Sequence, residues 1–317
     1  MRTIEEITAI ATAGEFDDAA MELFRFQARR CEPYRRYLEL LGVNPYEVIG
    51  VDQIPFLPIE LFRTHKVYSG EGEPEKIFTS SSTGGSEPSR HYMARLADYE
   101  QCFLSAYRQF YGSMPIYALL PCYLSREGSS LVYMVNRLVE LYGGGFFLDN
   151  HDELLERLRS DPRQKILLGV SYALLDLVEE CSPQLSNTIV METGGMKGRR
   201  RELPKEELHR ILCEGFGVSA IHSEYGMAEL SSQAYSAGGG VFRTPSWLRV
   251  EAREQNNPLE RLPHGVRGAI DIIDLGNRSS CAFIATQDVG TVFDDGSFRL
   301  SGRVEGSPVR GCNLLIE

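Results

Sequence analysis

The short segment between Phe78 and Arg90 carries an unusual density of groups that could bind phosphate. It holds five consecutive hydroxyl residues, a glycine and a basic residue: Thr79, Ser80, Ser81, Ser82, Thr83, Gly84 and Arg90. Small hydroxyl residues add O–H donors and let backbone N–H groups turn inward, glycine permits a positive φ, and the guanidinium supplies countercharge. The composition predicts a phosphate-binding loop, although a polar surface loop could have the same composition.

A second polar segment, Glu192–Gly198, follows the apolar run Thr188–Met191 and contains the pair Gly194 and Gly195. Because glycine has no side chain, this pair would let the backbone lie flat against a planar ligand. A tight strand-to-helix turn accounts for the same residues equally well.

A third polar segment, His222–Glu229, also follows a predicted strand. Tyr225 supplies an aromatic face, Gly226 and Met227 follow it, and Glu229 adds a carboxylate. An aromatic ring can stack on a base, and one carboxylate can hold magnesium. A helix cap with a surface glutamate is the alternative interpretation.

A carboxylate and a guanidinium near the end of the chain form the last candidate group. Asp288 lies in the segment Thr286–Gly290, and Arg303 follows Gly302 after a hairpin-like connection. On its own, such a pair often marks only a salt bridge.

The elements that must position these segments follow an α/β pattern. From residue 115 onward, short apolar runs alternate with amphipathic segments; strands are expected at 116–120, 146–148, 165–170, 188–191 and 219–223, and helices at 131–141, 154–158, 173–178 and 203–212. This alternation predicts a mainly parallel sheet with crossover helices. In such sheets ligands bind beyond the carboxyl ends of the strands, where the second and third polar segments lie.

The two ends of the chain differ from this middle part. Residues 1–70 are expected to be helical, except for 54–62, where Pro55 and Pro58 favour an extended segment packed on the core. After residue 240, short strands with Gly, Asn and Asp turns replace the helical patterns. We therefore predict three regions: a helical segment at 1–70, an α/β nucleotide-binding core at 71–240 and a β-rich subdomain at 241–317.

Composition narrows the class of protein. With 44 acidic and 33 basic residues, a net charge of -11 argues against a nucleic-acid-binding surface. No apolar run approaches the ~20 residues that span a bilayer, and the N-terminus lacks the layout of a signal peptide, so we expect a cytoplasmic protein without a membrane span. Its 7 scattered cysteines contain no C-x-x-C pair, which indicates reduced thiols. We expect all of them except Cys312 to be buried.

Taken in order, the four segments resemble the signature series of the adenylate-forming superfamily, which includes acyl-CoA ligases, luciferase and peptide-synthetase adenylation domains. In that family T-S-G-T-T-G-x-P-K-G precedes Y-G-x-T-E, T-G-D-x-G and G-R; the matching segments here are Thr79–Arg90, Tyr225–Glu229, Thr286–Gly290 and Gly302–Arg303. The resemblance implies an α/β fold: the large N-terminal domain of these enzymes, with mainly parallel sheets and flanking helices, followed by a small β-rich subdomain.

The resemblance also implies roles for the residues that match. The hydroxyl segment and Arg90 would wrap the ATP phosphates, and Glu229 would bind magnesium. Tyr225 would stack on adenine, next to Gly226 and Met227 and opposite Gly194 and Gly195. Asp288 and Arg303 would bind ribose, and Arg303 would also reach a phosphate.

In the first segment, Ser81 stands where the family has a glycine, and the segment has a short insertion. A further departure affects the α-phosphate. Ala228 stands where the family has a threonine whose hydroxyl meets the α-phosphate. The hydroxyl of Ser231 or Ser232 could supply that contact instead.

Residues 55–67 and 302–312 resemble a subgroup of short chains, the LuxE-type acyl-protein synthetases. Because the chain stops soon after Arg303, we expect it to lack the C-terminal domain that carries the superfamily's lysine. LuxE-type proteins take the acyl group onto a cysteine near their C-terminus. Cys312 is the candidate here, and Arg310 could favour its thiolate. A cysteine that is only packed in a terminal strand is the alternative.

The predicted function is ATP-dependent activation of a carboxylic acid of the fatty-acid type, with ATP and magnesium as cofactors. The acyl group would pass to a thiol: Cys312, coenzyme A, a carrier protein or an acyl-transfer partner subunit. We expect Glu229, Arg90 and Cys312 to be catalytic and the acyl pocket to lie near Gly194 and the aromatic residues Tyr117, Tyr123 and Phe146. Two alternatives are acyl transfer to coenzyme A or a carrier protein without an enzyme adduct, and a nucleotide-binding scaffold without catalysis.

Overall fold

The structure is a computed structural model, and it describes residues 1–80, 87–121, 128–194 and 203–304. Its helices are α1 Ile4–Thr8, α2 Ala13–Arg30, α3 Glu32–Leu40, α4 Leu61–Thr64, α5 Leu96–Tyr111, α6 Ser130–Tyr142, α7 His151–Ser160, α8 Ser171–Cys181 and α9 Lys205–Phe216. Its strands are β1 Leu57–Pro58, β2 Lys76–Thr79, β3 Arg90–Met93, β4 Ile116–Leu119, β5 Gly144–Phe147, β6 Lys165–Val170, β7 Thr188–Thr193, β8 Ile221–Tyr225, β9 Ala234–Ser236, β10 Val241–Arg243, β11 Leu248–Arg253, β12 Arg267–Asp274, β13 Phe283–Val292 and β14 Phe298–Arg303.

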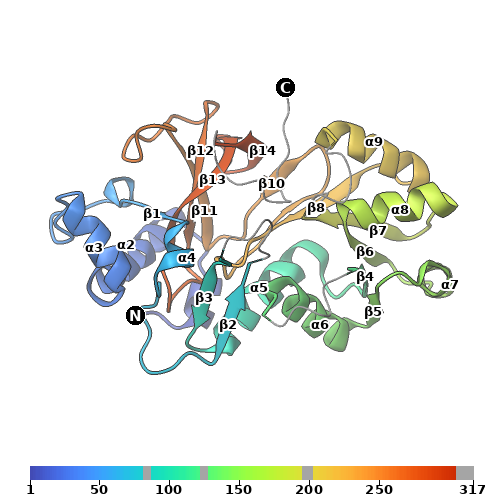
Figure 1. Cartoon of the computed structure of the whole chain (residues 1–317), viewed down its shortest axis with the longest axis horizontal. Coiled ribbons are helices and arrows are strands. Elements are labelled where there is room, and N and C mark those ends of the chain that lie inside the picture. Colours follow the sequence, from blue (N-terminus) through green and yellow to red (C-terminus); the bar gives the residue numbers. More distant parts are fainter. Residues whose placement is uncertain (81–86, 122–127, 195–202, 305–317) are drawn as a thin grey trace.

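One mixed sheet runs through the molecule (Figure 1). Its strand order is β11-β12-β13-β14-β10-β9-β8-β7-β6-β4-β5, and β1 adds to β13. The strands from β5 to β8 along this order are parallel, which confirms the predicted parallel sheet with crossover helices. The strands from β8 to β11 along the order pair antiparallel. Strands β2 and β3 form a separate hairpin.

Helices cover both faces of the parallel strands. In Figure 1, α8 and α9 lie above these strands, and α5 and α6 lie below them. We call the two sides the α9 face and the α5 face. Strand β6 is buried at every position and reads Lys-Ile-Leu-Leu-Gly-Val, as expected for a parallel strand that is covered on both sides.

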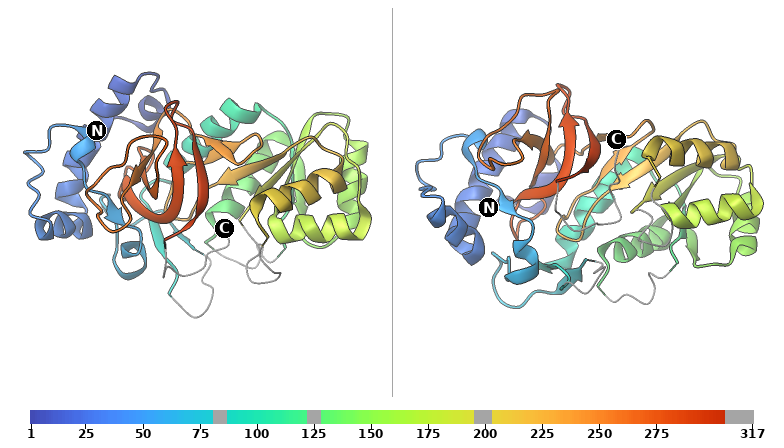
Figure 2. Two further views of the ribbon diagram at one scale, coloured as in Figure 1. Left: turned by 90° about the horizontal axis from the view of Figure 1, so that it is seen from above. Right: turned by 45° about the horizontal axis from the view of Figure 1, so that its top comes forward.

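The N-terminal helices pack against the antiparallel end of the sheet, opposite α7, α8 and α9 (Figure 2). Phe24 of α2 packs edge-on against Phe283 of β13, and the Gln27 side chain bonds the backbone at Asn277 and Ala282. The predicted extended segment at 54–62 is confirmed where β1 pairs with β13, although α4 already begins at Leu61.

The β-rich region after residue 240 continues the same sheet. Strand β10 pairs with β9 on one side and with β14 on the other, so hydrogen bonds cross the predicted boundary between residues 240 and 241. The division into three regions stays a prediction.

Composition led to two expectations, one about membrane-spanning helices and one about buried cysteines. Within the described residues, no helix is both long enough and apolar enough to cross a bilayer. Cys31, Cys102 and Cys281 are buried, as expected. The expectation of burial is wrong for Cys181, which is exposed, and for Cys213, which is partly exposed. Cys181 ends α8, where the helix reaches the surface.

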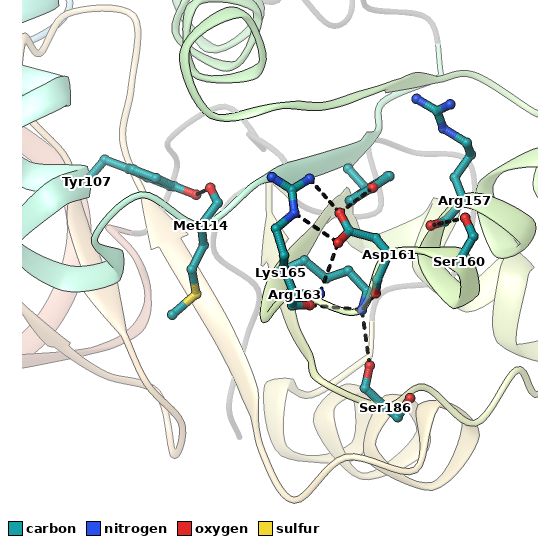
Figure 3. A network of polar contacts seen from close by, with 9 residues as sticks. Tyr107, Met114, Arg157, Ser160, Asp161, Arg163, Lys165 and Ser186 are labelled. Carbon is teal, nitrogen blue, oxygen red and sulfur yellow. Dashed lines mark hydrogen bonds and ion pairs between the residues drawn. The ribbon is translucent and has the colours of Figure 1, made fainter.

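A polar cluster around the buried Lys165 closes the amino end of β6 (Figure 3). The side chain of Lys165 is only 1% exposed, and its Nζ donates to the carbonyl oxygens of Asp161, Arg163 and Ser186 at 2.8, 3.2 and 3.4 Å. The Asp161 carboxylate accepts bonds from the Arg163 guanidinium at 2.9 and 2.7 Å and from the Tyr117 hydroxyl at 2.8 Å. We call these five residues the amino-end cluster.

The amino-end cluster corrects one prediction. Tyr117 was expected to line an acyl pocket near Gly194. Its hydroxyl is instead held by Asp161 at the amino end of β6, and its ring stacks on Phe147. The assignment of Tyr117 to the acyl pocket is therefore wrong.

Candidate active site

The hydroxyl segment begins at the last residue of β2, the first strand of the β2–β3 hairpin. Thr79 ends β2 and pairs with Arg90, the first residue of β3. Ser80 N donates to the Ser89 carbonyl at 3.2 Å, and Ser89 N donates to Ser80 Oγ at 3.0 Å, so the two strands are joined at the base of the predicted loop. Ser81, Ser82, Thr83 and Gly84 lie outside the described residues, and the phosphate-binding role stays a prediction.

His91, which the sequence reasoning missed, connects this hairpin to the third polar segment. Its side chain is 1% exposed, and Nδ1 lies 2.9 Å from the carbonyl oxygen of Ala228. Burial lowers the pKa of His91 to about 4, against smaller opposing effects of that carbonyl and of the Glu229 charge. The neutral imidazole therefore holds β3 beside the residue that precedes Glu229. A single histidine in a short strand gives no sequence signal for this partner.

Tyr225 and Asp288 are brought together by the fold. Tyr225 ends β8, and its hydroxyl donates to Asp288 Oδ2 of β13 at 2.7 Å. The Tyr225 ring is 4% exposed and packs edge-on against Phe242 and Phe298. The structure thus unites two residues that the motif order assigned to one nucleotide, while stacking of Tyr225 on adenine stays a prediction.

Arg303 lies directly beside Asp288. The two residues are partners in the antiparallel pairing of β13 and β14. The Arg303 guanidinium donates to the side-chain oxygen of Gln287. The predicted hairpin connection between the carboxylate and the guanidinium is therefore confirmed, and Asp288 and Arg303 lie close enough to contact one ligand.

Glu229 lies in the turn that follows β8. Its side chain has 0% exposure, and its carbonyl oxygen accepts a bond from Asn277 Nδ2 at 2.8 Å. Met227, between Gly226 and Glu229, is half-buried against the core. Burying a carboxylate costs free energy, so a fully buried glutamate in a polar turn marks a candidate functional group.

The suggestion that Ser231 or Ser232 contacts the α-phosphate is not supported. Ser231 Oγ donates to Asn277 Oδ1 at 2.6 Å, and Ser232 Oγ donates to Asp274 Oδ1 at 2.7 Å. Ser232 Oγ also accepts a bond from Trp247 Nε1 at 2.9 Å. Both side chains are fully buried, so their hydroxyls belong to a structural network beneath the turn.

Glu192 forms a buried ion pair at the carboxyl end of β7. Its Oε1 contacts Lys205 Nζ of α9 and lies 3.7 Å from His209 Nε2, and its Oε2 accepts a bond from Ser171 Oγ of α8 at 3.0 Å. Burial opposes ionisation of Glu192, but the charge of Lys205, the nearby His209 and the contact with Lys205 lower its pKa below the ordinary value. Glu192 is therefore a carboxylate at neutral pH.

Glu224, on the neighbouring strand β8, behaves in the opposite way. Its Oε2 lies 2.5 Å from Thr193 Oγ1 of β7. Burial, and next the charge of Glu192, raise the pKa of Glu224 to about 7, although the Thr193 hydroxyl opposes this. Two glutamates at the ends of adjacent parallel strands thus differ in protonation, because among the described residues Lys205 pairs with Glu192 and no cation pairs with Glu224. We missed both, although their place at the ends of adjacent predicted strands was a usable signal.

Two cavities adjoin these residues. A recess of about 10 Å³ is lined by Glu192, Gly194, Lys205, Glu224, Tyr225, Gly226, Phe242 and Leu300. Beside it, sharing Lys205, Phe242 and Leu300, lies a cavity of about 500 Å³ between α9, β10 and β14. Ligand sites commonly have about 300–1,000 Å³. Gly195, Tyr123 and Cys312 lie outside the described residues, so their predicted roles stay predictions.

No protein-family model matches the chain. The long-chain-fatty-acid–luciferin-component ligase of Vibrio harveyi is 23% identical over 324 residues, which cover 92% of this chain and 85% of the ligase.

Solved structures show the fold. A 2-hydroxyisobutyryl-CoA ligase in complex with 2-HIB-AMP and CoA matches 98% of this chain and 74% of its own, with a TM-score of 0.69 and 14% identity. ATP-bound MatB from Rhodopseudomonas palustris matches 74% of this chain with a TM-score of 0.54 and 16% identity. The chain spans about half the length, 49%, of this MatB structure. The chain therefore has the α/β fold of the adenylate-forming superfamily, and it is similar to the LuxE-type ligases within that superfamily, as the order of its motifs predicted.

Proposed function

We propose that this chain activates a carboxylic acid with ATP, forming an acyl-adenylate and pyrophosphate. The observation that carries the proposal is the junction of β8, β13 and β14, where Tyr225 bonds Asp288 and Asp288 lies beside Arg303. These residues are far apart in the sequence, and the motif order assigns all three to one nucleotide. The similarity to a fatty-acid ligase supports an acid as the second substrate.

The proposed reaction is an in-line displacement. A carboxylate oxygen of the acid attacks the α-phosphorus of ATP, the bond from that phosphorus to the bridging oxygen breaks, and pyrophosphate leaves. The chain contributes by positioning and by charge. Asp288 accepts hydrogen bonds from the ribose hydroxyls, Arg303 places a positive charge beside the nucleotide, and Thr79 and Ser80 begin the segment that donates to the outer phosphates.

Magnesium is the metal that this reaction implies. No three His, Cys, Asp or Glu side chains gather as a metal site within the described part of the chain. Magnesium bound with a nucleotide needs only one or two carboxylates, because phosphate oxygens and water complete its shell. The hard oxygen donors of Glu229 fit that requirement, and the bound ion would neutralise charge on the phosphates.

Acid-dependent exchange of labelled pyrophosphate into ATP tests the proposal. A panel of carboxylic acids should support exchange, and Glu229→Gln should lower it by about 100-fold or more, because the metal ligand is weakened. Glu214→Gln, an exposed substitution on α9, serves as the matched control. Unchanged exchange in Glu229→Gln would falsify the assignment, and ATP binding without exchange for any acid would favour a scaffold.

We also propose that the acyl group passes from the adenylate to a thiol. The thiolate sulfur attacks the acyl carbon, the bond from that carbon to the phosphate oxygen breaks, and AMP leaves. Similarity to the LuxE-type ligases makes Cys312 the candidate within the chain. Intact-protein mass spectrometry after incubation with ATP and acid should show an acyl adduct that Cys312→Ser removes. Formation of acyl-coenzyme A without an adduct would assign the acceptor to coenzyme A.

A further inference from the structure

Strand β3 and the residue before it place two buried polar side chains on one face. Burial alternates along this stretch: Ser89, His91 and Met93 are buried, and the two residues between them are more exposed. Because side chains alternate along a strand, Ser89 and His91 lie on the same face. Their exposed fractions are 0% and 1%.

One nitrogen of His91 anchors the turn that contains Glu229. Nδ1 lies 2.9 Å from the carbonyl oxygen of Ala228, and a carbonyl oxygen only accepts hydrogen bonds, so Nδ1 is the donor. In the neutral ring the other nitrogen, Nε2, is therefore an acceptor. The bond from Nδ1 ties β3 to the chain one residue before Glu229, the proposed magnesium ligand.

Both buried side chains hold a polar atom without a partner. Within the described residues, Ser89 Oγ and His91 Nε2 are shielded from solvent and make no hydrogen bond. Phe62 of α4 packs edge-on against the His91 ring and offers no donor. Most buried polar atoms are paired, and an unpaired one costs folding free energy. Two unpaired atoms on one face of a strand favour a partner that becomes buried with a bound ligand.

The acceptor character of Nε2 limits what this partner can be. Phosphate oxygens accept hydrogen bonds, so they do not suit Nε2. A water molecule bound to magnesium turns its oxygen to the ion and its O–H groups outward, so it donates to acceptors such as Nε2 and Ser89 Oγ. Magnesium that is bound with a nucleotide keeps several such waters. Side chains that bond the ligands of a metal ion also orient them.

We propose that His91 Nε2 and Ser89 Oγ accept hydrogen bonds from water in the shell of the magnesium ion that binds with ATP. This inference rests on the proposed adenylation and on Glu229 as a ligand of that ion. The two nitrogens of His91 then have separate roles: Nδ1 positions the turn of Glu229, and Nε2 positions metal-bound water. His91 is a positioning residue, because it acts through Ala228 and through water.

Two substitutions of His91 separate the roles of its nitrogens. An asparagine side chain places its amide donor near the position of Nδ1 and leaves nothing at Nε2, whereas a glutamine side chain reaches the position of Nε2. Calorimetry measures the binding of α,β-methylene-ATP, whose α–β bond resists cleavage, at a series of free Mg²⁺ concentrations and in EDTA.

His91→Asn should raise the Mg²⁺ concentration that gives half-maximal nucleotide affinity at least tenfold and leave the affinity in EDTA unchanged. Ser89→Ala should shift it in the same direction by a smaller factor. His91→Gln should shift it less than His91→Asn but should lower the melting temperature more, because the Ala228 carbonyl loses its donor. His264→Asn, at a histidine beside the exposed Asp294, is the matched control and should change none of these values.

An unchanged Mg²⁺ dependence in His91→Asn would overturn the inference. An equal loss of nucleotide affinity with Mg²⁺ and in EDTA would also overturn it, since His91 would then only support the turn. A larger Mg²⁺ shift in His91→Gln than in His91→Asn would assign the whole effect to the bond with Ala228. Mg²⁺-dependent nucleotide binding that responds to His91→Asn as expected, in a protein without acid-dependent pyrophosphate exchange, would contradict the proposed adenylation and leave this inference standing.

Discussion

The two ends of the parallel strands carry charged groups in contrasting arrangements. In the amino-end cluster, Lys165 donates to three carbonyl oxygens, and the Arg163 guanidinium holds Asp161 with two bonds (Figure 3). The hydrogen bonds from Arg163 lower the pKa of Asp161, and burial lowers the pKa of Lys165. At the carboxyl end, Lys205 is the cation that the described residues place beside Glu192 and Glu224, and it pairs with Glu192.

The difference separates a structural cluster from a binding site. Every charged group of the amino-end cluster has a partner, and such networks hold chain segments in one geometry. At the carboxyl end, one glutamate is ionised and its neighbour has its pKa raised to about 7, a separation typical of functional sites. Ligands of parallel sheets bind at the carboxyl end, so the electrostatic and topological arguments agree.

Removing the ammonium group of the amino-end cluster should have the largest effect on stability. Lys165→Met leaves three carbonyl oxygens without their donor, and we expect the free energy of unfolding to fall by about 3 kcal/mol. Urea denaturation monitored by circular dichroism measures this change. The affinity of the folded protein for ATP should stay the same.

A lysine-to-methionine change at a partly exposed position supplies the control for this prediction. Lys76→Met, at the start of β2, should alter stability by less than about 0.5 kcal/mol. If Lys165→Met instead weakened ATP binding without loss of stability, the amino-end cluster would contribute to nucleotide binding and could not be a purely structural cluster.

Breaking the ion pair at the carboxyl end should have a smaller, pH-dependent effect. Lys205→Met leaves Glu192 buried without its cation, and we expect a loss of about 2 kcal/mol near neutral pH. The folded-state pKa of Glu192 lies below its ordinary value of 4.5, so the pair stabilises the protein above about that pH. The deficit of the variant should therefore shrink as the pH falls below 4.5. Urea denaturation at a series of pH values measures it.

A double variant sharpens this second prediction. Glu192→Gln combined with Lys205→Met removes both charges and should recover most of the stability lost in the single variant. A deficit that is independent of pH, or a double variant as unstable as Lys205→Met, would mean that packing of the lysine stem on Phe242 outweighs its charge.

The sequence was sufficient for those features that depend on local pattern or on motif order. Apolar runs alternating with amphipathic segments predicted β6 and α8, and the order of the motifs predicted that Asp288 and Arg303 belong to one site. The sequence was not sufficient where a property depends on which strands pair and on which face of the sheet a side chain lies. Glu224 meets Thr193 only because β7 and β8 are parallel neighbours, and His91 meets Ala228 only through the packing of β3.

The substitution Glu224→Gln has the smallest expected effect, and it tests this residue through the pH dependence of the free energy of unfolding. Its folded-state pKa of about 7 lies above the ordinary value of 4.5, so the native state holds this proton more tightly than the unfolded chain. The contribution of Glu224 to wild-type stability should therefore fall as the pH rises from about 4.5 to 7, and Glu224→Gln should remove that contribution. We expect the variant to gain about 1 kcal/mol over the wild type at pH 7.5 and nothing at pH 4.5, since a half-buried residue is partly screened by solvent.

The comparison with Glu224→Gln isolates this carboxyl group, because the other groups that titrate in the window are the same in both proteins. Burial raises the pKa of Tyr99, Tyr111 and Tyr235, so they stay neutral, whereas burial lowers the pKa of His222 and gives this histidine a slope of opposite sign in both proteins. Glu192 is already ionised across the same range. Urea denaturation between pH 4.5 and 7.5 measures the difference, with Glu140→Gln on the exposed side of α6 as control. Parallel stability curves for Glu224→Gln and the wild type would mean that Glu224 ionises at its ordinary pKa, and the contrast between the two ends of the sheet would then rest on Glu192 and Lys205 alone.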